Sequence, residues 1–176
     1  MQIDGNKEPE EVQSAEPAKE EEIKNDPITD VNTTTKKSAY VGILEIPKIG
    51  LTKGFTSIDS KLNTVDRGLQ VIKPSNYPDV EKGNFIIASH SGTSSISYFK
   101  NLYQVQINDI VNAYYNGKKY TYTIVNIYTQ PKNGQIAIYR NYEATVITLV
   151  TCTKNDDTTQ TVYIGELTSV ADYKEV

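Results

Sequence analysis

The sequence predicts a mainly β domain, folded as a closed barrel or a sandwich. From Tyr40 onward the chain consists largely of short runs rich in β-branched residues and tyrosine, and all 13 tyrosines and three phenylalanines lie there. Such runs are typical of strands. The connections between them are short and helical patterns are weak, which favours a barrel or sandwich over an α/β sheet.

The first part of the chain differs in composition from the rest. Only 38% of the 176 residues are hydrophobic, and residues 1–37 contain no aromatic side chain and few large apolar ones. A segment of this kind cannot bury enough surface to offset its ordering entropy. We therefore expect a disordered acidic linker or stalk over residues 1–37 and a folded domain over residues 38–176.

Charge and cysteine content exclude several classes of function. The net charge is −4, and no basic stripe points to nucleic acid. A single cysteine rules out an intrachain disulfide framework, and no pattern of metal ligands is present, so we expect no metal and no cofactor. No apolar run reaches about 18 residues, which is the length of a membrane span.

The folded part begins with recognisable strands. "YVGILEIPKIGL" predicts a strand over residues 40–51 in which Pro47 marks an edge or a strand end. "GNFIIASH" predicts a short buried strand that ends at His90. Residues 57–68 and 95–105 carry weak apolar spacing that predicts one or two short helices.

The second half contains the clearest hairpin. Asn116-Gly117 is the dipeptide of a type I′ turn, and tyrosine-rich runs flank it. "ATVITLVTC" and "QTVYIGEL" then predict two further strands. The segment between them, "TKNDDTT", has no glycine or proline, so we expect a loop longer than a tight turn.

His90 and Cys152 are the only histidine and the only cysteine. Each ends a predicted apolar strand and opens a polar loop, where a rigid scaffold presents reactive groups. A thiolate attacks a carbonyl while an imidazolium protonates the leaving amine. The alternatives are a cysteine buried as a small hydrophobe and a structural histidine.

Several motifs resemble one family. "TLVTC" is similar to the TLxTC signature of the sortases, the cysteine transpeptidases of Gram-positive cell surfaces. "LEIPKIGL", "IIASHSGT" and "YFKNLYQVQINDIV" resemble other segments of that family in the expected order. The resemblance covers Tyr40 to about Leu167.

The resemblance implies a closed eight-stranded β-barrel and a two-step reaction. An LPxTG-like sorting signal on a surface protein or pilin is cleaved through a thioester on Cys152, and an amine of the cell wall or of a pilin lysine accepts the acyl group. The resemblance also implies attachment to the extracellular face of the cell membrane by an N-terminal anchor that this chain lacks.

The same resemblance assigns roles to residues. Cys152 matches the nucleophile and His90 the general acid, while Thr151 is expected to lend a backbone N–H or a hydroxyl near the reaction centre. The residues expected on the substrate path are Thr148, Leu149, Ser91 and Arg140.

One position departs from the family. The arginine expected on the strand after the cysteine loop falls at Gln160, and no arginine follows Arg140. Gln160 serves as a neutral oxyanion donor, or Arg140 or Arg67 reaches the site from another loop, or the third position is weak or unused.

Two other classes compete with this interpretation. Papain-like enzymes, caspases and L,D-transpeptidases have signatures or spacings that this sequence lacks. A catalytically weak or inactive surface binding module with sortase architecture is the non-enzymatic alternative, and the missing arginine favours it. The sortase class, the exact sorting motif and the nucleophilic acceptor stay open.

Overall fold

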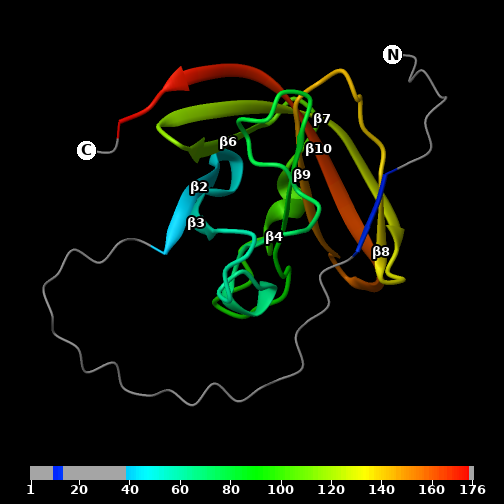
Figure 1. Cartoon of the computed structure of the whole chain (residues 1–176). Helices are drawn as coiled ribbons and strands as arrows, with labels where there is room; N and C mark the ends of the chain where they lie inside the picture. The colour runs from blue at the N-terminus through cyan, green and yellow to red at the C-terminus, as the bar shows by residue number, and fades with distance from the viewer. Residues whose placement is uncertain (1–9, 14–38, 175–176) are drawn as a thin grey trace, which may run out of the picture.

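The computed structural model describes residues 10–13 and 39–174. Its main sheet has eight strands in the order β3-β2-β6-β7-β10-β9-β5-β4, and the two end strands contact each other. The sheet therefore forms a nearly closed barrel (Figure 1), as predicted. These strands are β2 (Tyr40–Ile46), β3 (Leu51–Thr56), β4 (Gln70–Val71), β5 (Asn84–Ala88), β6 (Ile110–Tyr115), β7 (Lys118–Pro131), β9 (Val146–Thr153) and β10 (Asp156–Asp172).

Two buried clusters lie on opposite faces of this sheet. The larger one takes side chains from all eight strands, Leu149 among them, and fills the barrel. The second contains Val150 together with side chains of β8 (Gln135–Ile138), which covers the outer face. Because side chains alternate along a strand, Cys152 lies on the same outer face as Val150.

The β6–β7 hairpin confirms the prediction from Asn116-Gly117. Both residues have positive φ, 49° and 77°, as a type I′ turn requires. The turn between β9 and β10 corrects another prediction, because it is tight: Thr153 pairs with Asp156. Asn155 adopts a φ of 61° there, and asparagine accepts the left-handed conformation without a glycine.

Helical structure is limited to three single 3-10 turns among the described residues. They are η1 (Pro47–Ile49), η2 (Val65–Arg67) and η3 (Leu102–Gln104). The short helix predicted over residues 57–68 is reduced to η2. One reason is that the Asn63 side chain donates to the Val71 carbonyl and accepts from its N–H, at 2.9 and 2.7 Å, and such bonds compete with a helix.

A further strand comes from the N-terminal segment. β1 (Glu10–Gln13) pairs antiparallel with β8, so that Glu10 lies opposite Ile138 and Gln13 opposite Gln135. Figure 1 shows β1 alongside β8 at the edge of the molecule. The rest of the predicted stalk lies outside the described residues.

Candidate functional site

The site is a row of side chains across three neighbouring strands. β5 and β9 run parallel with Ala88 beside Val150, and two residues further along these chain segments are His90 and Cys152. β10 is antiparallel to β9 and places Gln160 opposite Cys152. Paired residues on neighbouring strands share one face of a sheet. The fold therefore brings together the three residues singled out in the sequence.

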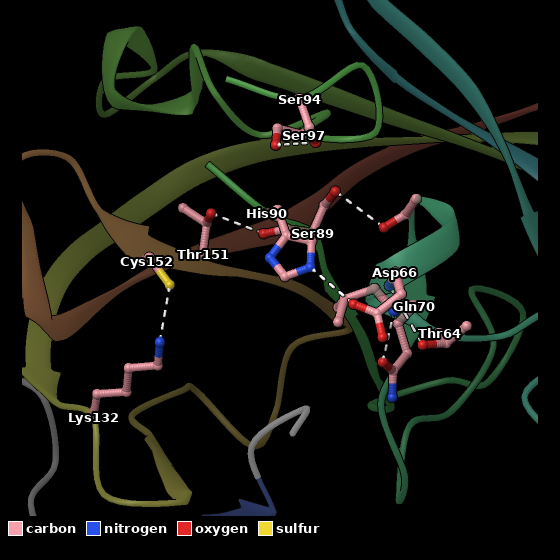
Figure 2. A network of polar contacts seen from close by, with 12 residues as sticks. Thr64, Asp66, Gln70, Ser89, His90, Ser94, Ser97, Lys132, Thr151 and Cys152 are labelled. Carbon is pink, nitrogen blue, oxygen red and sulfur yellow. Dashed lines mark hydrogen bonds and ion pairs between the residues drawn. The ribbon is translucent and has the colours of Figure 1, made fainter. Parts of the chain in front are cut away.

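His90 has a carboxylate partner that the sequence did not reveal. Its Nε2 lies 3.3 Å from Oδ1 of Asp66, and the two side chains are 36% and 43% exposed. In Figure 2 the imidazole lies between Cys152 and Asp66. Asp66 belongs to η2, where its N–H donates to Thr64 Oγ1 at 3.3 Å. In this contact the ring turns its Nε2 toward the Asp66 carboxylate.

A set of buried hydrogen bonds joins the segments that contain His90 and Cys152. The Thr151 hydroxyl donates to the Ser89 carbonyl at 2.9 Å, and the Ser89 hydroxyl donates to the Gly68 carbonyl at 3.1 Å. Thr151 precedes Cys152, Ser89 precedes His90, and Gly68 follows η2. The Thr151 hydroxyl thus holds these segments in register.

Lys132 contacts Cys152. Its Nζ lies 3.4 Å from Cys152 Sγ (Figure 2). The Lys132 backbone N–H donates to the Thr158 carbonyl at 2.9 Å, which ties the end of β7 to β10. Sequence reasoning missed Lys132 because its proximity arises only once β7 and β10 pair.

Gln160 is buried opposite Cys152, with only 7% of its surface exposed. Within the part of the chain that the structure describes, its Oε1 has no hydrogen-bond partner, and neither has the buried Nε2 of Gln130. The two residues stand opposite each other on β10 and β7, and Gln130 Oε1 accepts from the Ala137 N–H at 2.9 Å. A donor and an acceptor that lack partners among the described residues thus belong to paired residues of β7 and β10.

A bulge in β10 sets the position of Gln160. The register shifts between Asp156 and Gln160. The Asp156 carboxylate accepts from the Thr158 hydroxyl at 2.6 Å and N–H at 3.0 Å, and from the Thr159 hydroxyl at 3.1 Å. The hydrogen bonds from Thr158 above all lower the pKa of Asp156. Bulges of this kind re-aim the side chains that follow them.

Two signature residues expected on the substrate path are buried instead. Thr148 is 0% exposed and donates its hydroxyl to Asn84 Oδ1 at 2.7 Å. Leu149 is 0% exposed inside the barrel. Neither offers surface to a ligand, so their place in the motif reflects packing. Ser91 is half-buried in the loop after His90.

The two arginines lie in different places. Arg140 donates to the carbonyls of Lys82 and Ala144, at the starts of β5 and β9, whereas Cys152 is at the far end of β9. The structure does not bring Arg140 to Cys152. Arg67 is exposed at the end of η2, one residue after Asp66.

Two features are absent from the described residues. No helix in residues 10–13 and 39–174 is long and apolar enough to cross a membrane. Nor do three or more His, Cys, Asp or Glu side chains gather there in a way that would hold a metal ion.

Comparisons with known proteins agree on one family. Residues 44–168 match the family model described as Sortase domain. No curated protein matches the chain.

Solved structures show the same fold. Sortase A from Listeria monocytogenes is 22% identical with a TM-score of 0.65, over 78% of this chain and 93% of that one. Sortase C1 from Streptococcus agalactiae is 22% identical with a TM-score of 0.63, over 77% and 71%. Sortase E1 from Streptomyces coelicolor, solved with a tripeptide in its active site, is 21% identical with a TM-score of 0.62, over 76% and 90%.

Proposed function

Because the chain belongs to the sortase family, we propose that it is a cysteine transpeptidase with Cys152 as nucleophile and His90 as general acid. The observation that carries this proposal is the row formed by His90, two residues beyond β5, with Cys152 on β9 and Gln160 on β10. A substrate carbonyl above Cys152 is then within reach of an acid on one side and an amide on the other.

The first step is acylation. The Cys152 thiolate attacks the carbonyl carbon of the scissile peptide bond, and the π electron pair moves to the carbonyl oxygen. When this intermediate collapses, the C–N bond breaks and His90 gives its proton to the departing amine. The acyl group stays on Sγ as a thioester.

The second step is transfer. An acceptor amine gives up a proton to the now neutral His90 as it attacks the thioester carbonyl. The C–S bond breaks, Sγ departs as a thiolate, and a new amide forms. The imidazolium is thereby restored, so the two steps balance without a cofactor.

Gln160 is the proposed donor to the oxyanion of both intermediates. A half-turn of its terminal amide exchanges the oxygen and the NH₂ group, so the buried position opposite Cys152 accommodates a donor. Gln130 faces it with a free donor among the described residues and favours the orientation that turns the Gln160 NH₂ toward the nucleophile. Side-chain amides fill oxyanion holes in other enzymes.

Sortases are enzymes of the cell surface that act on surface proteins or pilins with sorting signals. We extend this to an LPxTG-like signal as acyl donor, and to an amine of the cell wall or of a pilin lysine as acceptor. A sortase C described as pilus-related is among the similar structures, at 21% identity. Work at the extracellular face of the membrane belongs to the same proposal.

The test combines the protein, a panel of LPxTG-like peptides and an amine acceptor. Mass spectrometry is expected to detect an acyl adduct on Cys152 and a ligated product, and Cys152→Ala should give neither. If no sorting motif yields an adduct with the intact protein, the transpeptidase proposal fails.

The arginine's absence from its usual place is the observation that favours the alternative, an inactive surface binding module. Iodoacetamide distinguishes the two because it reports thiol reactivity without a substrate. An enzyme should show fast alkylation of Cys152 that slows in His90→Ala. A module should show slow alkylation that His90→Ala leaves unchanged.

A further inference from the structure

Lys132 is a cation in contact with the proposed nucleophile, and no motif assigns it a role. We infer that Lys132 is a catalytic residue that carries the charge an arginine carries elsewhere in the family. This inference rests on the proposed function, since it assigns a partner to the same nucleophile. The contact of 3.4 Å between Nζ and Cys152 Sγ is its starting point.

The backbone places this side chain on the correct face. Gln130 lies opposite Gln160, which in turn lies opposite Cys152. Lys132 follows Gln130 by two residues, and side chains two apart along an extended chain share a face. The Lys132 N–H bond to the Thr158 carbonyl, at 2.9 Å, keeps the chain beside β10. The lysine therefore reaches Sγ across β10 from the side opposite β5, the strand that ends two residues before His90.

A cation beside Cys152 would stabilise negative charge on Sγ at two stages of the proposed reaction. In the resting enzyme an ammonium stabilises the negative charge on Cys152 Sγ. During transfer it stabilises the same charge as Sγ leaves the thioester. Lysine is a point charge without the planar fork of arginine, so it suits a single sulfur atom and leaves the oxyanion to Gln160. The chain thus divides between two side chains the tasks that one arginine performs.

A neighbouring lysine provides a matched control. Lys154 lies two residues after Cys152, in the β9–β10 turn, but its Nζ sits 3.4 Å from the centroid of the Tyr103 ring. Its hydrogen bond is the main reason that the pKa of Tyr103 is lowered. Lys154 therefore brings an equal charge to the same turn without pairing with Sγ.

The experiment measures alkylation of Cys152 at low salt by iodoacetate, an anion, and by iodoacetamide, which is neutral. The ratio of the two rates reports the positive charge beside Sγ. We expect Lys132→Met to lower this ratio about fivefold, which corresponds to the Coulomb energy of one charge at about 4 Å in water. Lys132→Arg should keep the ratio within about twofold. Lys154→Met should leave it near the value of the unmodified protein.

Two results would overturn the inference. One is a ratio that Lys132→Met does not change. The other is an equal fall of this ratio in Lys132→Met and Lys154→Met. That result would mean that the ratio reports only the overall positive charge around Cys152 and no specific contact with Lys132. A thermal melt of each variant checks that the fold is intact.

Acyl-enzyme formation from a sorting peptide separates this inference from the proposed function. If the alkylation ratio falls in Lys132→Met but no peptide acylates the intact protein, Lys132 pairs with Cys152 and the transpeptidase proposal is wrong. If acylation proceeds equally in the intact protein and in Lys132→Met, the function stands and the role of Lys132 is wrong.

Discussion

The two ends of the β5–β9 strand pair use charged side chains in different ways. At the end where both strands begin, Arg140 donates to the carbonyls of Lys82 and Ala144, and Lys82 Nζ pairs with Glu143 at 3.0 Å. The Lys82 N–H also donates to Thr145 Oγ1 at 2.8 Å. Charges at this end close loops and satisfy backbone carbonyls.

At the other end, the charged groups face the side chains that we propose to be catalytic. Asp66 faces the His90 imidazole, Lys132 faces Cys152 Sγ, and Gln160 keeps a buried amide oxygen without a partner among the described residues. The ends are about 20 Å apart at the usual strand rise. Buried amide atoms without a partner among the described residues occur at both ends, Asn84 Nδ2 at one and Gln160 Oε1 at the other, so the ends differ in what their charged groups face.

Among the substitutions that test this difference, we expect those at Gln160 to change the acylation rate most. Gln160→Ala removes the proposed oxyanion donor, and we expect kcat for acylation to fall by about 10²–10³, or about 2.7–4 kcal/mol. Gln160→Arg should retain or raise the rate because it restores a charged donor. Single-turnover formation of the acyl-enzyme measures both.

Gln106→Ala removes an exposed glutamine outside the row and serves as the control for these variants. A Gln160→Ala variant that acylates as fast as the control would exclude Gln160 as the oxyanion donor.

Arg140 tests the opposite end of the strand pair. Arg140→Met removes charged hydrogen bonds to two carbonyls, and we expect the free energy of unfolding to fall by about 1–2 kcal/mol. The alkylation rate of Cys152 should not change, because Arg140 lies far along the sheet. Urea denaturation and iodoacetamide labelling measure the two quantities.

Glu143→Gln provides the comparison for Arg140, since the Lys82–Glu143 pair is exposed and worth less than about 1 kcal/mol. If acylation is slower in Arg140→Met and stability is unchanged, Arg140 takes part in the reaction at Cys152.

The difference between the two ends also explains what the sequence reveals. His90 and Cys152 were predictable because each directly follows a run of buried strand residues. Gln160 was predictable by counting along the strand after the cysteine. In each case the prediction needs only the alternation of residues along a strand and the family motif, and both can be read from the sequence.

Contacts that loop residues make with distant parts of the chain cannot be predicted from strand alternation or from the motif. Asp66 reaches His90 from a single 3-10 turn, and Lys132 reaches Cys152 only after β7 pairs with β10. The tight turn at Asn155 was missed because an asparagine took the left-handed position where a glycine was expected. Burial of Thr148 and Leu149 depends on which face of β9 meets the barrel interior and on the packing around it, and the motif alone does not state this.

Substitution of Asp66 is expected to change the acylation rate least, and it tests how far the proposed site extends beyond His90. Asp66→Asn keeps an oxygen facing His90 Nε2 but removes the charge. Because both side chains are well exposed, the pair is worth about 0.2–1 kcal/mol, so we expect acylation to slow by no more than about fivefold. Salt screens exposed charges, so at 1 M salt the rates of the intact protein and Asp66→Asn should converge. Asp66→Ala should stay slower at any salt, because it also loses the hydrogen bond that orients the ring. If the gap between the intact protein and Asp66→Asn persists at 1 M salt, the carboxylate acts on the reacting groups themselves, and the reactive end extends from Cys152 to η2.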